Sequence, residues 1–105
     1  MKKDQLDRIS KEKQRYEQEG FIIIGFFGSV ARDEETKQSD LDILYELTDK
    51  FLANYQGWDL YYRIHEIQSE LESHLGVSVD LANKDTLDDI GKYFILKDLV
   101  YVSKG

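Results

Sequence analysis

The sequence contains no cysteine and no proline, and it has no long apolar segment. Without cysteine the chain can form neither a disulfide scaffold nor a thiolate metal site. The longest nearly continuous apolar run, FIIIGFF at residues 21–27, is far shorter than the roughly 20 residues that span a bilayer. No apolar segment follows the basic start Met1-Lys2-Lys3. We therefore expect no signal peptide, no membrane contact and a cytoplasmic location.

Positive charge is scarce as well. The net charge is −7, with 14 Lys and Arg against 21 Asp and Glu, and the basic residues are scattered. Because nucleic-acid affinity comes largely from clustered Lys and Arg, we expect no direct nucleic-acid binding. Such a chain can still bind one small polyphosphate if metal ions supply the positive charge.

The 105 residues show no repeat, low-complexity tract or Pro/Ser-rich linker, so we expect one domain over residues 1–105. Two amphipathic helices are predicted, each ending at a glycine: residues 3–19 before Gly20, and the Leu- and Ile-striped segment before Gly76. Other segments predict three strands, a helical turn and a short helix, at residues 21–27, 40–47, 77–82, 30–35 and 87–96. The pattern favours an α+β fold: a small mixed sheet with helices packed on one face.

Three aspartates are the first candidates for chemistry. Asp40 and Asp42 lie two residues apart on a predicted strand, so their side chains share a face about 6.6 Å apart. Asp80 is predicted on the polar face of the next strand, about 4.8 Å away. Like charges about 7 Å apart repel by roughly 2.4 kcal/mol at an effective dielectric of 20, so a bound divalent ion is the natural reason to tolerate them. The alternative for the Asp40–Asp42 pair alone is an edge strand facing water.

A Gly-Ser turn is the second candidate. Gly28 and Ser29 end the buried strand and begin the predicted helical turn, so their N–H groups and the Ser29 hydroxyl can face an anion. An ordinary turn is the alternative, and no GK[ST] follows, so this is not a Walker loop. Ser29 precedes Asp40 by eleven residues, on the preceding strand. Phosphoryl transfer needs both an anion cradle and metal ligands.

The run GSVARDEETKQSDLDIL at residues 28–44 resembles the signature of the DNA polymerase β-like nucleotidyltransferases. In that signature Gly-Ser, Ala-Arg and Ser-Asp-x-Asp precede an apolar residue, and a third aspartate lies on a later strand. Over nearly its whole length the chain resembles the minimal nucleotidyltransferases. The resemblance implies these nucleotide-binding residues: Gly28, Ser29, Arg32 and Ser39. It implies these catalytic ligands of two Mg²⁺ ions: Asp40, Asp42 and Asp80, the last also activating the nucleophile.

One position departs from the family pattern. The glycine that usually follows the arginine is replaced by Asp33, and Glu34 and Glu35 come next. Negative charges near a triphosphate lower affinity unless they point outward. The segment is therefore either solvated surface or the sign of a weakened enzyme.

Minimal nucleotidyltransferases of this size resemble the antitoxin half of toxin–antitoxin pairs whose toxin is a helical HEPN ribonuclease. The implied reaction is transfer of AMP from ATP to a tyrosine of the toxin within a hetero-oligomer. Relatives that modify drugs or extend polymers hold the acceptor with an added domain, so this acceptor is expected to bring its own surface. Two alternatives stay open: a binding module that neutralises its partner by contact, and a subunit that modifies a small molecule.

Other residues support less specific interpretations. An aromatic cluster near the start of the second long helix is assigned to core packing, with a partner-binding patch as the alternative: Tyr55, Trp58, Tyr61 and Tyr62. His65 and His74 are nine residues apart and are not expected to share a metal. Lys84 is interpreted as a surface lysine, with a phosphate contact as the alternative.

Overall fold

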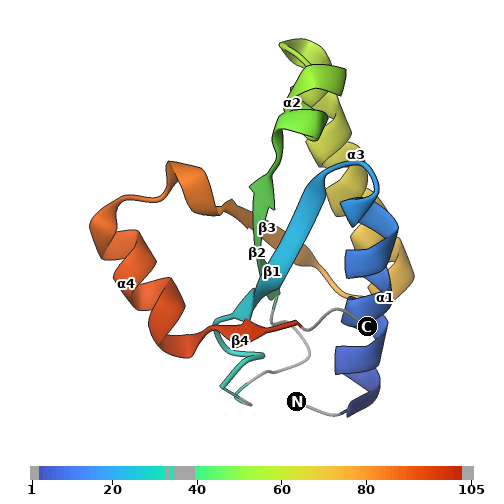
Figure 1. Ribbon diagram of the computed structural model, residues 1–105. Coiled ribbons are helices and arrows are strands. Elements are labelled where there is room, and N and C mark those ends of the chain that lie inside the picture. The colour runs from blue at the N-terminus through green and yellow to red at the C-terminus, as the bar shows by residue number, and fades with distance from the viewer. Residues whose placement is uncertain (1–2, 33, 35–39, 103–105) are drawn as a thin grey trace.

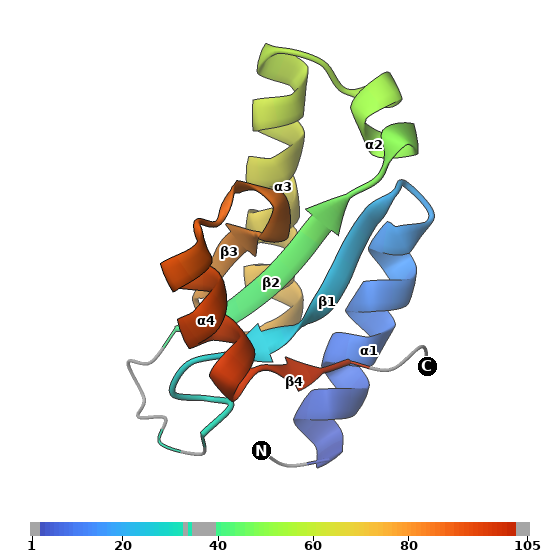
Figure 2. The same ribbon diagram turned by 60° about the vertical axis from the view of Figure 1, so that its left-hand side comes forward.

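Two long helices lie against one face of a four-stranded sheet (Figure 1). The computed structural model describes residues 3–32, 34 and 40–102. Helix α1 spans Lys3–Glu17 and α3 spans Trp58–Leu75, with the short helix α2, Asp49–Asn54, before α3. Helix α4, Asp89–Asp98, lies on the other side of the sheet (Figures 1 and 2). Within the described residues, no helix has both the length and the apolar character needed to cross a membrane.

The sheet is mixed, and its strands run in the order β3-β2-β1-β4. Strand β1, Phe21–Phe27, is antiparallel to β2, Leu41–Leu47, and to the short β4, Val100–Tyr101. Strand β3, Val79–Asn83, is parallel to β2. The expected α+β class with a small mixed sheet is confirmed.

The hydrophobic core fills the space between the sheet and helices α1 and α3. Phe21 stacks on Tyr45 with ring centroids 4.6 Å apart. Each large side chain removed from water in this layer stabilises the fold by roughly 1.5–3 kcal/mol. The residues that form it are fully or almost fully buried: Ile9, Tyr16, Phe21, Ile23, Phe26, Leu41, Ile43, Tyr45, Phe51, Ile67, Leu71 and Val79. The predicted apolar stripes of both long helices therefore face the sheet.

Both β3 and α4 begin two residues later than predicted. Strand β3 begins at Val79, and Val77, expected to point inward, is 41% exposed. The reason is that Gly76 ends α3 in the left-handed conformation, φ 72°, and the next residues must still turn toward the sheet. Helix α4 begins at Asp89 because the Asp88 carboxylate accepts a hydrogen bond from the Gly91 N–H at 2.6 Å, which caps the helix.

Of the helical turn predicted over residues 30–35, residues 30–32 and 34 are described, and they form a hydrogen-bonded turn that is not a regular helix; residues 33 and 35 lie outside the described residues. The Arg32 N–H donates to the Gly28 carbonyl at 3.1 Å, as in a helix, but the Glu34 N–H donates to Ser29 at 2.8 Å, one residue beyond the helical partner. A single isolated turn does not offset the cost of helix nucleation. The amides of Gly28 and Ser29 therefore belong to a hydrogen-bonded turn.

Candidate functional site

Asp42 and Asp80 lie side by side on parallel strands. Their Cα atoms are direct partners in the register of β2 and β3. Leu41 and Ile43, which flank Asp42 along β2, are buried under the long helices. Because side chains alternate along a strand, Asp42 and Asp80 face the other side of the sheet, the side on which α4 lies. The structure thus brings together two of the three aspartates that the sequence singled out.

Gly28, which follows β1, lies directly against the Asp42 carboxylate. Its φ is +81°, a backbone region that L side chains rarely adopt. A Cβ at this position would lie 2.2 Å from Oδ2 of Asp42, so any side chain there would displace the carboxylate. The neighbouring Phe27 is the strand partner of Asp42 in the antiparallel pair β1–β2. Glycine therefore allows the loop backbone and the aspartate to share one small space.

The charge environment of Asp42 is unfavourable to its ionised form. Burial raises the pKa of Asp42 above its usual range, and the negative charges of Asp80 and Asp40 raise it further. The positive charge of Arg32 opposes this increase in pKa. Asp40 and Asp80 are exposed. Asp42 is therefore repelled by both Asp80 and Asp40, and a bound cation would relieve this repulsion.

The donor atoms of this site suit a hard divalent cation. Carboxylate oxygens on adjacent strands are the ligands that Mg²⁺ prefers, and the space above Gly28 is open only because no Cβ fills it. As the side chains stand, no group of three or more His, Asp or Glu among the described residues is arranged to hold a metal ion. The residues fit Mg²⁺ in chemistry and in position on the sheet, but the side chains would have to adjust around it.

Arg32 is already paired with two carboxylates. Its guanidinium donates to Glu34 at 3.1 Å and to Asp98, at the end of α4, at 2.8 Å. These contacts raise the pKa of Arg32, the bond to Glu34 most strongly. Asp98 is 66 residues away in the chain, and no motif in the sequence indicates that it lies beside the candidate site.

The acidic segment after Arg32 is only partly described. The Glu34 side chain is 64% exposed and contacts Arg32, which agrees with the solvated-surface interpretation for that residue. Asp33 and Glu35 lie outside the described residues, as does Ser39, a predicted nucleotide-binding residue. Ser29 is described; it lies half-buried in the turn that follows Gly28.

The remaining candidates lie away from the aspartates or have other partners. His74 contacts Glu12 at 2.5 Å, whereas His65 packs against Tyr61 with ring centroids 4.3 Å apart. Lys84 forms an exposed ion pair with Glu46 at 3.6 Å, in agreement with its interpretation as a surface lysine.

Core packing, the preferred interpretation of the aromatic cluster, is wrong for Trp58, Tyr61 and Tyr62. Their side chains are 75%, 53% and 62% exposed, because the face of α3 that meets the sheet carries Ile67 and Leu71. These three aromatic side chains form a surface cluster at the start of α3, which we call the α3 patch.

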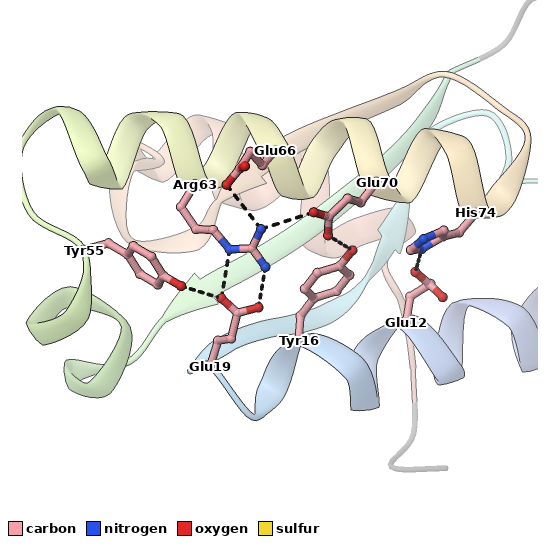
Figure 3. A network of polar contacts seen from close by, with 8 residues as sticks. All are labelled: Glu12, Tyr16, Glu19, Tyr55, Arg63, Glu66, Glu70 and His74. Atoms are coloured by element: carbon pink, nitrogen blue, oxygen red, sulfur yellow. Dashed lines mark hydrogen bonds and ion pairs between the residues drawn. The ribbon is translucent and has the colours of Figure 1, made fainter.

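A polar network between α1 and α3 was not predicted from the sequence (Figure 3). Arg63, whose side chain is only 15% exposed, donates to Glu19 and Glu70, and Glu19 also accepts from the Tyr55 hydroxyl at 2.9 Å. The Tyr16 hydroxyl donates to Glu70 at 2.7 Å. A lone Arg on an amphipathic helix is the only signal in the sequence, and it does not reveal the partners.

The fold and the site together define a class of enzyme. The family model for the nucleotidyltransferase domain matches residues 6–102, so the chain belongs to that family and is a nucleotidyltransferase. The protein adenylyltransferase MntA of Thermococcus cleftensis is 32% identical over 91 residues, which cover 87% of this chain and 84% of that protein. A candidate protein adenylyltransferase of Methanocaldococcus jannaschii is 36% identical over 96 residues, 90% of this chain and 85% of its own.

Two solved structures share the fold. A candidate minimal nucleotidyltransferase superposes with a TM-score of 0.69 at 25% identity, over 95% of both chains. A toxin–antitoxin crystal structure with AMP-PNP superposes with a TM-score of 0.68 over 95% of this chain and 73% of that one. The second is 18% identical and shows the fold alone. The resemblance to minimal nucleotidyltransferases, which extends over nearly the whole chain, is confirmed.

Proposed function

We propose that this nucleotidyltransferase is an antitoxin that transfers AMP from ATP to a tyrosine of a HEPN-type toxin. The observation that carries the proposal is the placement of Asp42 in register with Asp80 and against the Gly28 turn. The names of the relatives, protein adenylyltransferases, support transfer of AMP to a protein. A structure that shares the fold was solved as a toxin–antitoxin with AMP-PNP, and the proposal adopts an adenine nucleotide and a toxin partner from that neighbour. The complex would form in the cytoplasm.

Each part of the site has a proposed task. The loop residues Gly28 and Ser29 would donate to the triphosphate, together with Ser39. Arg32 would neutralise phosphate charge by exchanging one of its two carboxylate partners, Glu34 or Asp98, for a phosphate oxygen. The ligands of two Mg²⁺ ions would be Asp40, Asp42 and Asp80. When bound, Mg²⁺ supplies positive charge that offsets the charge of the triphosphate and of the three carboxylates.

The proposed chemical step is an in-line displacement at phosphorus. The hydroxyl oxygen of the acceptor tyrosine forms a bond to the α-phosphorus of ATP. Its proton passes to the Asp80 carboxylate, which is exposed and therefore accessible from solvent. The bond between the α-phosphorus and the oxygen that bridges to the β-phosphate breaks, and pyrophosphate leaves. The products are AMP-tyrosine on the partner and pyrophosphate.

Intact-mass spectrometry tests this function. The chain is co-expressed with the HEPN-type protein of the neighbouring reading frame, purified, and incubated with ATP and Mg²⁺. The partner should gain the mass of one or more AMP groups, and label from α-labelled ATP should appear on one of its tyrosines. A partner that binds but gains no mass with any nucleotide would establish a non-catalytic binding antitoxin. Modification of a small molecule instead would refute the choice of acceptor and leave nucleotidyl transfer intact.

A further inference from the structure

The ion pair between Arg32 and Asp98 joins two parts of the molecule that lie 66 residues apart in the chain. Nη1 of Arg32 donates to Oδ2 of Asp98 at 2.8 Å, and Asp98 is the last residue of α4. Arg32 follows the Gly28 turn, where its backbone N–H donates to the Gly28 carbonyl at 3.1 Å. The end of α4 is therefore attached through one guanidinium to the proposed nucleotide loop, residues 28–32.

The position of Asp98 is fixed by the strand that follows it. Figure 2 shows α4 leading into β4, which pairs with β1. A Cβ at Gly25 would lie 2.3 Å from the Val100 carbonyl oxygen, so the close approach of these two strands requires glycine. After β4, the N–H of the buried Val102 donates to the Ile24 carbonyl at 3.1 Å. Because the nucleotide loop begins at the end of β1, Asp98 and the loop are placed relative to the same strand.

The helix itself does not explain a carboxylate at this position. Aligned peptide dipoles give the C-terminal end of a helix a partial negative charge, so an aspartate at the last residue is unfavourable there. At the other end of α4 an acidic residue is favourable, and the Asp88 side chain accepts from the Gly91 N–H at 2.6 Å. The side chain of Asp98 is only 26% exposed, so water screens its pair with Arg32 less than it screens a surface pair. Asp98 is therefore placed for Arg32 and not for the stability of α4.

Glu34, the other partner of Arg32, is held less firmly. It contacts Nε of Arg32 at 3.1 Å, its side chain is 64% exposed, and it lies two residues further along the same segment. An ion pair so exposed is screened by water and contributes little free energy. A guanidinium has five N–H donors, so a phosphate oxygen can replace Glu34 while Asp98 stays bound to Nη1. Of the two carboxylates, Glu34 is therefore the one that a phosphate displaces.

The orientation of Arg32 matters because the neighbouring site is rich in carboxylates. Arg32 already acts electrostatically on Asp42, whose pKa its positive charge lowers. Without Asp98, the guanidinium is free to pair with the Asp42 carboxylate, in competition with a metal ion. A bound phosphate would also have to remove the added rotamer freedom of the arginine, at a cost in affinity. A fixed guanidinium avoids both losses.

We propose that Asp98 is a positioning residue of the nucleotide site, which holds the Arg32 guanidinium ready to bind a phosphate group of ATP while that phosphate displaces Glu34. This inference rests on the proposed role of Arg32 in binding the triphosphate. It assigns opposite roles to two carboxylates that contact one guanidinium. Asp98 assists nucleotide binding, and Glu34 opposes it.

Calorimetric titration of the full chain with Mg²⁺ and the α,β-methylene analogue of ATP, from which AMP cannot be transferred, tests these roles. Asp98→Asn should raise the Kd about fivefold or more, and Glu34→Gln should lower it. The matched control Asp89→Asn removes the same charge from the exposed first residue of α4 and should change the Kd less than about twofold. Removal of a negative charge by itself favours an anionic ligand, so weaker binding to Asp98→Asn has the opposite sign to a simple charge effect.

A double-mutant cycle separates positioning from a structural role. Arg32→Ala should raise the Kd at least as much as Asp98→Asn does. In the Arg32→Ala chain Asp98 has no guanidinium to hold, so the further change Asp98→Asn should alter the Kd less than about twofold. A structural role of Asp98 would instead weaken binding in both backgrounds and lower the melting temperature in both. We expect the melting temperature to change little, because loss of the ion pair is offset by relief at the end of the helix.

Each outcome decides the proposal. An unchanged or lower Kd for Asp98→Asn, an equal loss for Asp89→Asn, or an equal loss in the Arg32→Ala background would overturn it. A Kd for Glu34→Gln that is not lower would refute the displacement of Glu34. If the parent chain does not bind the analogue, the proposed function and the positioning role fail together. If the variants follow the expected order but the parent transfers no AMP from ATP to the partner protein, only the proposed function fails.

Discussion

The two polar regions on opposite sides of the sheet differ in how their carboxylates are paired: Glu19 faces a cation, whereas Asp42 lies beside other carboxylates. Between α1 and α3, Glu19 faces Arg63 and the Tyr55 hydroxyl, and the Arg63 hydrogen bond lowers the pKa of Glu19 (Figure 3). On the other face, Asp42 lies beside Asp80, and burial together with like charge raises its pKa. The first region is complete in itself and stabilises the fold. The second has like charges side by side, which Arg32 offsets in part, and carboxylates with pKa values perturbed in this way cluster at functional sites.

Removal of one negative charge from the second region gives the largest expected effect. Asp42→Asn should lower AMP transfer about 100-fold or more, because the site loses metal-binding charge. Without Mg²⁺ its melting temperature should stay level or rise, since the change removes repulsion with Asp80 and Asp40. Thermal melts with and without Mg²⁺ check this, alongside the mass assay. A variant that melts several degrees lower, or that keeps full activity, would show that Asp42 has a structural role.

Removal of Arg63 from the network between α1 and α3 should lower the stability of the fold and leave nucleotide binding unchanged. Arg63→Ala leaves Glu19 and Glu70 without their cationic partner at a site where the Arg63 side chain is 15% exposed. We expect a loss of about 2–3 kcal/mol in the free energy of unfolding, below the value for a fully buried pair. Urea denaturation measures it, with Arg63→Lys as the control that keeps the charge but not the planar fork. The ATP affinity of the folded fraction should be unchanged, and a large change in it would connect the two regions.

A smaller effect is expected in the nucleotide loop. Ser29→Ala removes one donor from the proposed phosphate contacts and should weaken ATP binding by about 1–3 kcal/mol. The half-buried position of Ser29 in a turn makes a large loss of stability unexpected. Calorimetric titration with ATP and Mg²⁺ gives the affinity, and a denaturation curve serves as the control. ATP binding at the parent's affinity would remove Ser29 from the site.

The smallest effect concerns pH. Because the pKa of Glu19 is lowered in the folded state, its ionised form contributes stability above the pKa of the unfolded chain, roughly 4.3. That contribution is lost as the pH falls from this value through the lowered one. Glu19→Gln should therefore cost about 1 kcal/mol at pH 7 and almost nothing at acidic pH. Denaturation curves at several pH values check this, and a cost that stays constant in acid would show that charge is not the cause.

Local patterns in the sequence predicted much of the fold. Alternation along DLDILYEL placed Asp42 opposite the buried Leu41 and Ile43, because a strand has a period of two. The spacing of Ile67 and Leu71 and the stop at Gly76 predicted α3 for the equivalent reason in a helix. The start of β3 was predicted two residues too early, because the left-handed cap at Gly76 still has to turn the chain toward the sheet.

The aromatic residues mark the limit of sequence patterns. An exposed Trp58 and a buried Phe51 have similar chemistry, and only the packing of α2 and α3 on the sheet decides which of them meets water. The same is true of Tyr93 and Phe94 on α4, whose exposure no periodicity in the sequence indicated. For such residues, the residue type predicts a tendency to be buried but not whether a particular side chain is buried.

The sequence by itself determined the class of the enzyme, the two amphipathic helices and the alternation that turns Asp42 away from the core. These features depend on neighbours within a few residues, or on one strand beside another, where geometry is the same in every protein. Only the tertiary structure decided that Asp98 meets Arg32, that Arg63 joins α3 to the turn after α1, and that α4 lies on the side of the aspartates. Such contacts join residues far apart in the chain, and their free energy depends on the packing of the whole molecule.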